Sequence, residues 1–93
     1  MENTQLSLDA KIEALLFYKG EPVSFKELAK SFAVSEEEVK TAVSTLTEKL
    51  SDRGISLVIN EREVMLGTAP QLSGFFEELR KEELNKELSR ASL

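Results

Sequence analysis

The sequence predicts a mainly α-helical domain with a small β-hairpin, an α+β fold of the winged helix-turn-helix type. Two observations carry this prediction. Two serine-capped helical segments stand only two residues apart, and a segment of alternating apolar residues, which predicts a strand, follows them. The 93 residues leave room for one small domain with a modest core.

A first helix is predicted from Leu8 to Tyr18, with Ser7 as its N-cap. Gly20 ends this helix, and Pro22 prevents its continuation. Its apolar residues spread over most of the circumference. One face carries Leu8, Ile12, Leu15 and Leu16, and the other sides carry Ala10, Ala14, Phe17 and Tyr18. Such a helix either lies at the centre of a core or is covered by a second surface.

Capping boxes predict the start of the next two helices. Ser24 and Glu27 have the required spacing, and Ser35 and Glu38 repeat it. The apolar stripes behind these caps are Phe25, Leu28, Ala29 and Phe32, then Val39, Ala42, Val43, Leu46 and Leu50. Because only two residues separate the helices, they should cross steeply. Gly54 is expected to take a left-handed conformation after the second of them.

The periodicity changes to two after residue 54. Apolar residues at positions 55, 57 and 59 alternate with Ser56, Val58 and Asn60, which predicts a strand. Residues 60–63 turn the chain, and residues 64–66 return as a second strand. This two-stranded hairpin would be the wing, without a larger sheet.

The last predicted helix begins near Pro70, which is tolerated in a first turn because its missing N–H is not needed there. Its apolar residues follow i, i+3, i+4, i+7 spacing: Leu72, Phe75, Phe76 and Leu79. Five of the seven residues from 81 to 87 are then charged. We therefore expect a winged-helix dimerisation domain at residues 1–80. Residues 81–93 should form a linker and the start of a second winged helix.

The composition argues against several classes of function. The chain has no histidine and no cysteine, so it lacks the usual proton shuttle, a thiol nucleophile and the common transition-metal ligands. Its four glycines are scattered and form no phosphate-binding loop. No apolar run approaches the ~20 residues of a membrane span. We expect a cytoplasmic protein that is not an enzyme, with no cofactor and no metal site.

Winged helices often bind DNA, but the charge of this chain argues against it. The net charge is −5, and residues 36–49 hold four glutamates against two lysines. In the wing, Glu61 and Glu63 flank Arg62. Carboxylates at these positions would repel phosphates. We expect no sequence-specific DNA binding. The alternative, a DNA-binding regulator, would need a local basic patch, for which the candidates are Lys26, Lys30, Lys40 and Arg62.

The surplus of apolar residues on the first and last helices predicts a surface for self-association. Large exposed apolar patches usually mark a partner. We expect these two helices to lie side by side, away from the wing, and to pack on a second copy in a symmetric dimer. The candidate interface residues are Leu8, Ile12, Leu15, Leu16, Phe75, Phe76 and Leu79. The alternative is that they belong to the core.

Several blocks of the chain resemble one known family. The first three are Ile12-Glu13-Ala14-Leu15-Leu16-Phe17, Gly20-Glu21-Pro22-Val23-Ser24 and Glu27-Leu28-Ala29. The later ones are Val34-Ser35-Glu36-Glu37-Glu38-Val39, Arg53-Gly54-Ile55 and Leu88-Ser89-Arg90-Ala91-Ser92-Leu93. Together they resemble the N-terminal domain of bacterial segregation and condensation protein B over residues 6–93. The last block is similar to the start of that family's second winged helix.

This resemblance implies a non-catalytic, homodimerising subunit of the bacterial condensin-type complex. It implies binding to the kleisin subunit, segregation and condensation protein A, and through it to the SMC ATPase. The implied role is chromosome condensation and segregation at the nucleoid. In this family the N-terminal domain mainly forms the homodimer, and the second domain makes much of the kleisin contact. Residues 62–68 depart from the family's aromatic and basic wing pattern.

Overall fold

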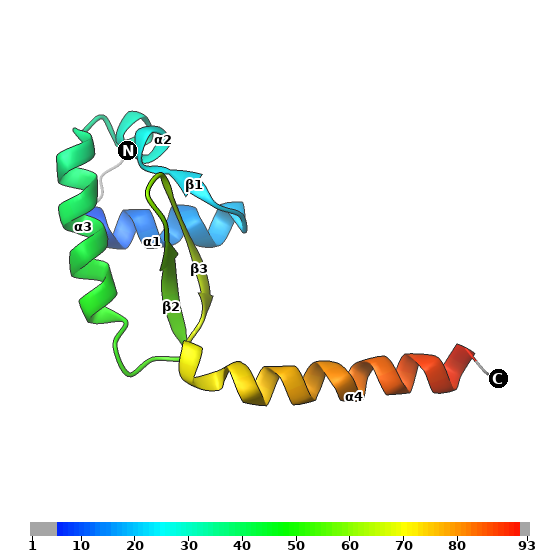
Figure 1. The fold of residues 1–93 in the computed structure, drawn as a ribbon. Helices are drawn as coiled ribbons and strands as arrows, with labels where there is room; N and C mark the ends of the chain where they lie inside the picture. The colour runs from blue at the N-terminus through cyan, green and yellow to red at the C-terminus, as the bar shows by residue number, and fades with distance from the viewer. Residues whose placement is uncertain (1–5, 92–93) are drawn as a thin grey trace.

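The computed structural model describes residues 6–91, and the side chains of residues 6–85. The elements follow the order α1 (Leu8–Lys19), β1 (Val23–Ser24), α2 (Phe25–Phe32), α3 (Glu36–Lys49), β2 (Ile55–Ile59), β3 (Glu63–Thr68), the 3₁₀ turn η1 (Pro70–Leu72) and α4 (Ser73–Ala91) (Figure 1). Three helices and a hairpin in this order confirm the predicted winged-helix fold.

Helix α1 ends one residue beyond its predicted boundary. Gly20 takes a left-handed conformation (φ +66°), and its N–H donates to the carbonyl of Leu16. At the other end, Ser7 is the N-cap residue, as predicted, but its hydroxyl makes no side-chain cap bond to a backbone N–H. Glycine at this C-terminal position satisfies a free carbonyl at low steric cost.

The capping box at α3 is complete. The Glu38 N–H donates to Ser35 Oγ at 3.0 Å, and the Ser35 N–H donates to Glu38 Oε1 at 2.9 Å. At α2 only half of the predicted box forms. The Glu27 N–H donates to Ser24 Oγ, but the Glu27 carboxylate pairs with Lys19 of α1 at 3.1 Å. A tertiary ion pair has replaced the local contact.

The prediction of a left-handed Gly54 is wrong, because Asp52 takes that conformation instead (φ +64°). The chain leaves α3 through hydrogen bonds from the N–H of Ser51 to the carbonyl of Glu48 and from the N–H of Arg53 to that of Leu50. These bonds place the reversal two residues before the glycine. Aspartate tolerates the left-handed region better than most residues do.

The sheet has three antiparallel strands in the order β1-β3-β2, so the expectation of a hairpin alone is also wrong. Strand β3 pairs with β2 on one edge, and its other edge accepts β1, with Val23 opposite Val64. Both valines are buried, which explains why a two-residue link becomes a strand. In the wing turn, Asn60 Oδ1 accepts from the N–H groups of Arg62 and Glu63 at 2.8 and 2.7 Å.

The hydrophobic core lies between α1, α2 and α3 and the inner face of β1 and β3. Its most completely buried side chains are Ile12, Leu16, Val23, Leu28, Val39, Leu46 and Val64. Each of the three N-terminal helices directs its predicted apolar stripe into this core. The α2 helix lies across the N-terminal end of α3 and does not run back alongside it (Figure 1).

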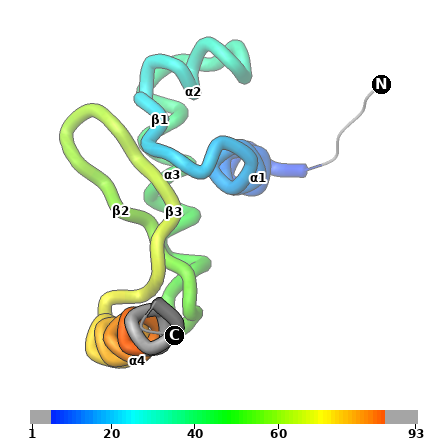
Figure 2. Tube along the Cα trace, turned by 90° about the vertical axis from the view of Figure 1, so that its right-hand side faces the viewer, coloured from blue at the N-terminus to red at the C-terminus, as the bar shows by residue number. Residues whose placement is uncertain are grey.

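Helix α4 extends away from this body, and its main contacts within the described residues are with η1 (Figures 1 and 2). The molecule measures 54 × 26 × 26 Å and has a radius of gyration of 17.1 Å. A compact domain of this length would have a radius of gyration of about 12 Å. The expectation that the first and last helices lie side by side is therefore wrong for the single protomer.

Residues 81–91 continue α4 without a break, so the expected domain boundary at residue 80 falls inside a helix. The expected start of a second winged helix lies largely outside the residues with described side chains. Among the described helices, none combines the length and the apolar character that crossing a membrane requires.

Candidate interaction surfaces

Exposed apolar side chains gather on two surfaces of the molecule. The first, which we call the α4 stripe, comprises Leu72, Phe75, Phe76 and Leu79. Phe75 is 61% exposed, and Phe76 and Leu79 are each 37% exposed. The two phenylalanine rings pack edge to face, with their centroids 5.0 Å apart and their planes at 74°. This pairing holds a broad aromatic surface toward solvent.

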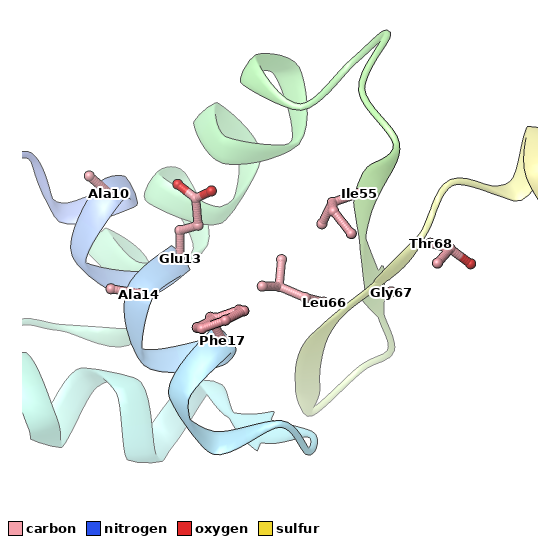
Figure 3. Close-up of a pocket in the computed structure, with 8 residues that line it drawn as sticks. All are labelled: Ala10, Glu13, Ala14, Phe17, Ile55, Leu66, Gly67 and Thr68. Carbon is pink, nitrogen blue, oxygen red and sulfur yellow. The ribbon is translucent and has the colours of Figure 1, made fainter.

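The second surface is a groove between α1 and the β2–β3 hairpin, with a volume of about 510 Å³ (Figure 3). We call it the α1–hairpin groove; it is lined by Ala10, Glu13, Ala14, Phe17, Ile55, Leu66, Gly67 and Thr68. The Phe17 and Leu66 side chains point toward one another across it. Phe17 is 80% exposed, and Glu13 is the one charged residue in the lining.

The structure does not bring the seven predicted interface residues together. Ile12 and Leu16 are 0 and 1% exposed and belong to the core. Leu8 and Leu15 are half-buried against that core. Of the seven residues, the three on α4 are the most exposed, so their burial separates Ile12 and Leu16, which belong to the core, from the candidate contacts.

Sequence reasoning left Phe17 and Tyr18 out of the predicted interface. They are the most exposed large apolar side chains of the described residues, at 80 and 83%. The signal that could have found them was present, because both lie outside the main apolar face of α1. A helix that is apolar around its whole circumference must leave some of those residues uncovered in a small domain.

An ion pair fixes the start of α1 against the end of α3. Lys49 Nζ donates to Asp9 Oδ2 at 2.9 Å, and the Asp9 side chain is 10% exposed. The Lys49 ammonium, helped by the Ser7 hydroxyl, holds the pKa of Asp9 below its usual range. Similarly, Glu27 raises the pKa of Lys19 across the α1–α2 contact. Both pairs stabilise the body and leave α4 untouched.

Three of the four candidate DNA-binding cations lie around one hollow between α2, α3 and the wing. Its lining includes Lys26, Lys40 and Arg62, but also Glu36 and Glu61, while Lys30 is not part of it. Two carboxylates among three cations leave little positive charge for a phosphate backbone. Within the described residues, no three carboxylates lie close enough together to hold a metal ion.

Comparison with known proteins identifies related sequences over most of the chain. The sequence model of the family "Segregation and condensation complex subunit ScpB" matches residues 10–93. A segregation and condensation protein B of Carboxydothermus hydrogenoformans is 42% identical over 78 residues, which are 82% of this chain and 42% of the relative. One from Clostridium botulinum is 36% identical over 84 residues, 88% of this chain and 44% of the relative.

Two solved structures share the fold. One is described as a dimer of the ScpB N-terminal domain complexed with an ScpA peptide; it is 31% identical, with a TM-score of 0.67, and the match covers 76% of this chain and 91% of that one. The other is ScpB from Mycobacterium tuberculosis, 22% identical with a TM-score of 0.73, covering 90% of this chain and 54% of that one. The chain spans about half the length of the curated relatives it matches.

Proposed function

The chain belongs to the family of the segregation and condensation complex subunit ScpB, and we propose that it is a non-catalytic, homodimerising part of a bacterial condensin-type complex. In this role it binds the kleisin subunit, segregation and condensation protein A, and through it the SMC ATPase. The complex acts in chromosome condensation and segregation, in the cytoplasm and at the nucleoid.

The exposed α4 stripe is the observation that carries this proposal. Phe75, Phe76 and Leu79 lie on a helix that extends away from the body and has no core beneath it. An apolar surface of this kind marks an interaction site in a protein whose body is otherwise well packed. The related N-terminal domain that was solved as a dimer with an ScpA peptide supports the same role for this chain.

Light scattering after size-exclusion chromatography, at low and at high salt, tests dimerisation. We expect a dimer that persists at high salt, because apolar contacts are not weakened by ionic screening. Phe75→Asp should give a folded monomer, since Phe75 is 61% exposed and contributes little to the core. Leu84→Asp, on the same helix beyond the α4 stripe, is the control and should remain dimeric. A wild-type monomer at both salt concentrations would contradict the proposal.

Titration of a fluorescently labelled fragment of segregation and condensation protein A tests kleisin binding separately. We expect saturable binding to the chain, measured by fluorescence anisotropy. Absence of binding to a chain that still dimerises would refute the kleisin contact while leaving the dimer intact.

The hollow lined by Lys26, Lys40 and Arg62 is the observation that favours the alternative, a DNA-binding regulator. That function predicts affinity for duplex DNA that falls steeply with salt and weakens in Lys40→Gln. We expect no binding in 150 mM salt, because Glu36 and Glu61 lie in the same hollow.

A further inference from the structure

We propose that, in the dimer, the α4 stripe of each protomer occupies the α1–hairpin groove of the other. This inference rests on the proposed dimerisation and names the two surfaces that meet. It differs from the simplest symmetric arrangement, in which two α4 stripes pack on one another. Both surfaces are exposed to solvent in the single protomer. A dimer would therefore contain two α4 stripes and two grooves, which can form two equivalent contacts.

The two surfaces match in shape and in apolar character. The groove is concave, with a volume of about 510 Å³, and its walls are formed mainly by small and apolar residues. The α4 stripe is convex and presents two phenylalanine rings. A helix that lays its apolar face into such a groove is a recurrent mode of protein recognition. Contact between unlike surfaces, repeated about a two-fold axis, gives a closed dimer.

Charge complementarity supports the same pairing. Glu13 is the one charged residue in the groove lining. Arg80 follows Phe76 by four residues and lies on the same side of α4, where both line a shallow hollow together with Ser73 and Glu77. When the phenylalanine enters the groove, Arg80 can reach the rim that carries Glu13.

The exposed area is sufficient for a substantial part of an interface. Phe17, Phe75 and Phe76 are 80, 61 and 37% exposed. Because an aromatic side chain buries ~150–250 Å², these rings would contribute on the order of 350 Å² per protomer and 700 Å² per dimer. Specific interfaces bury roughly 1,200–2,000 Å² in total. The aliphatic residues of both surfaces and their polar rims would add to the aromatic area.

Cysteine cross-linking distinguishes this arrangement from the alternatives, since the chain has no cysteine of its own. An Ala14→Cys chain carries its cysteine in the groove, and a Glu77→Cys chain carries its cysteine beside the α4 stripe. We would mix the two chains and add a short bismaleimide, which joins cysteines that lie close together. We expect several-fold more mixed dimer than from Ser44→Cys with Glu77→Cys, a control on the exposed side of α3. Predominant linkage of Glu77→Cys to itself would overturn the inference in favour of α4–α4 packing.

Two adjacent residues of α1 provide a matched pair of variants. Phe17→Asp should raise the dimer dissociation constant at least about tenfold, because an aromatic contact is lost and a charge is buried. Tyr18→Asp, at a residue equally exposed but outside the groove lining, should change it by less than about twofold. Circular dichroism should show both variants folded.

The failures of the two proposals are distinguishable. If Phe75→Asp abolishes the dimer and Phe17→Asp does not, dimerisation stands and the groove contact is wrong. If the wild-type chain is monomeric, both fall. In that case a cross-link within a single Ala14→Cys/Glu77→Cys chain would show that α4 folds back into its own groove.

Discussion

Helices α1 and α4 both carry several large apolar residues, yet the structure treats them in opposite ways. In α1, Ile12 and Leu16 are completely buried; in α4, Phe75 and Leu84 are more than half exposed. Both helices were expected to supply the same interface. The difference shows that the spacing of apolar residues identifies which face of a helix is to be buried. It does not show whether that face is buried by the same chain or by a partner.

The cause lies in what surrounds each helix. Helix α1 packs against α3 on one side and β3 on another, and the Asp9–Lys49 ion pair holds its first turn. Helix α4 follows β3 and η1 at the edge of the body (Figure 2) and extends away from it (Figure 1). Its second half carries Lys81, Glu82 and Glu83 in succession. These side chains are well solvated, so this part of the helix does not need to pack against the body.

The strongest test of this contrast truncates one leucine on each helix. Leu16→Ala should destabilise the protein by about 2–5 kcal/mol, because it leaves a cavity in the core. Leu84→Ala should change the free energy of unfolding by less than about 0.5 kcal/mol, since that side chain is 53% exposed. Urea unfolding followed by circular dichroism measures both. Equal losses would mean that α4 is packed as firmly as α1.

A matched pair of glycines sharpens the comparison at the level of the backbone. An added Cβ would meet no atom within 4 Å at either Gly20 or Gly74, so any effect comes from backbone conformation. Gly20→Ala should cost about 1–2 kcal/mol because residue 20 is left-handed. Gly74→Ala should stabilise the protein by up to ~1 kcal/mol because residue 74 is helical. Thermal unfolding should therefore move in opposite directions; a common sign would contradict the assigned conformations.

The smallest effect concerns the ion pair that only α1 possesses. Asp9→Asn should cost about 1 kcal/mol at neutral pH, which is less than a fully buried charged hydrogen bond contributes, because Lys49 is 59% exposed and solvent screens the pair. The Lys49 ammonium holds the pKa of Asp9 in the folded chain below the usual value of 3.8 for an aspartate. Its contribution is therefore fully present above that value and is lost as the pH falls through the folded pKa.

Urea unfolding of wild type and Asp9→Asn from pH 7 to pH 2 measures this linkage. The two stabilities should converge in acid. A difference that stays constant with pH would show that the carboxylate charge is not involved.

Most helix and strand boundaries could be predicted because the signals for them are local. The Ser35–Glu38 capping box and the left-handed Gly20 act within one turn of the chain. The errors involve contacts between distant residues. Val23 becomes part of a strand only because β3 offers it a free edge, and Glu27 leaves its capping box because Lys19 lies within reach.

The candidate surfaces were predictable only in part, for the same physical reason. The spacing of Phe75, Phe76 and Leu79 indicated a continuous apolar stripe, and the structure leaves that stripe exposed. It did not indicate the groove, which needs residues of α1 beside residues of the hairpin more than 35 positions later in the chain. Nor did it single out Phe17 from the apolar residues around it.

The order of elements, their caps and their apolar faces follow from residues within a few positions of one another, and the amino-acid sequence alone was enough to derive them. Which apolar faces are covered follows from the three-dimensional packing, because burial depends on the elements that happen to approach. In this protein the packing covers Ile12 and Leu16, opens a groove beside Phe17 and leaves the described side chains of α4 exposed. Hydrophobic burial is non-directional. The spacing of apolar residues therefore shows which faces are to be buried, and the tertiary structure determines which elements bury them.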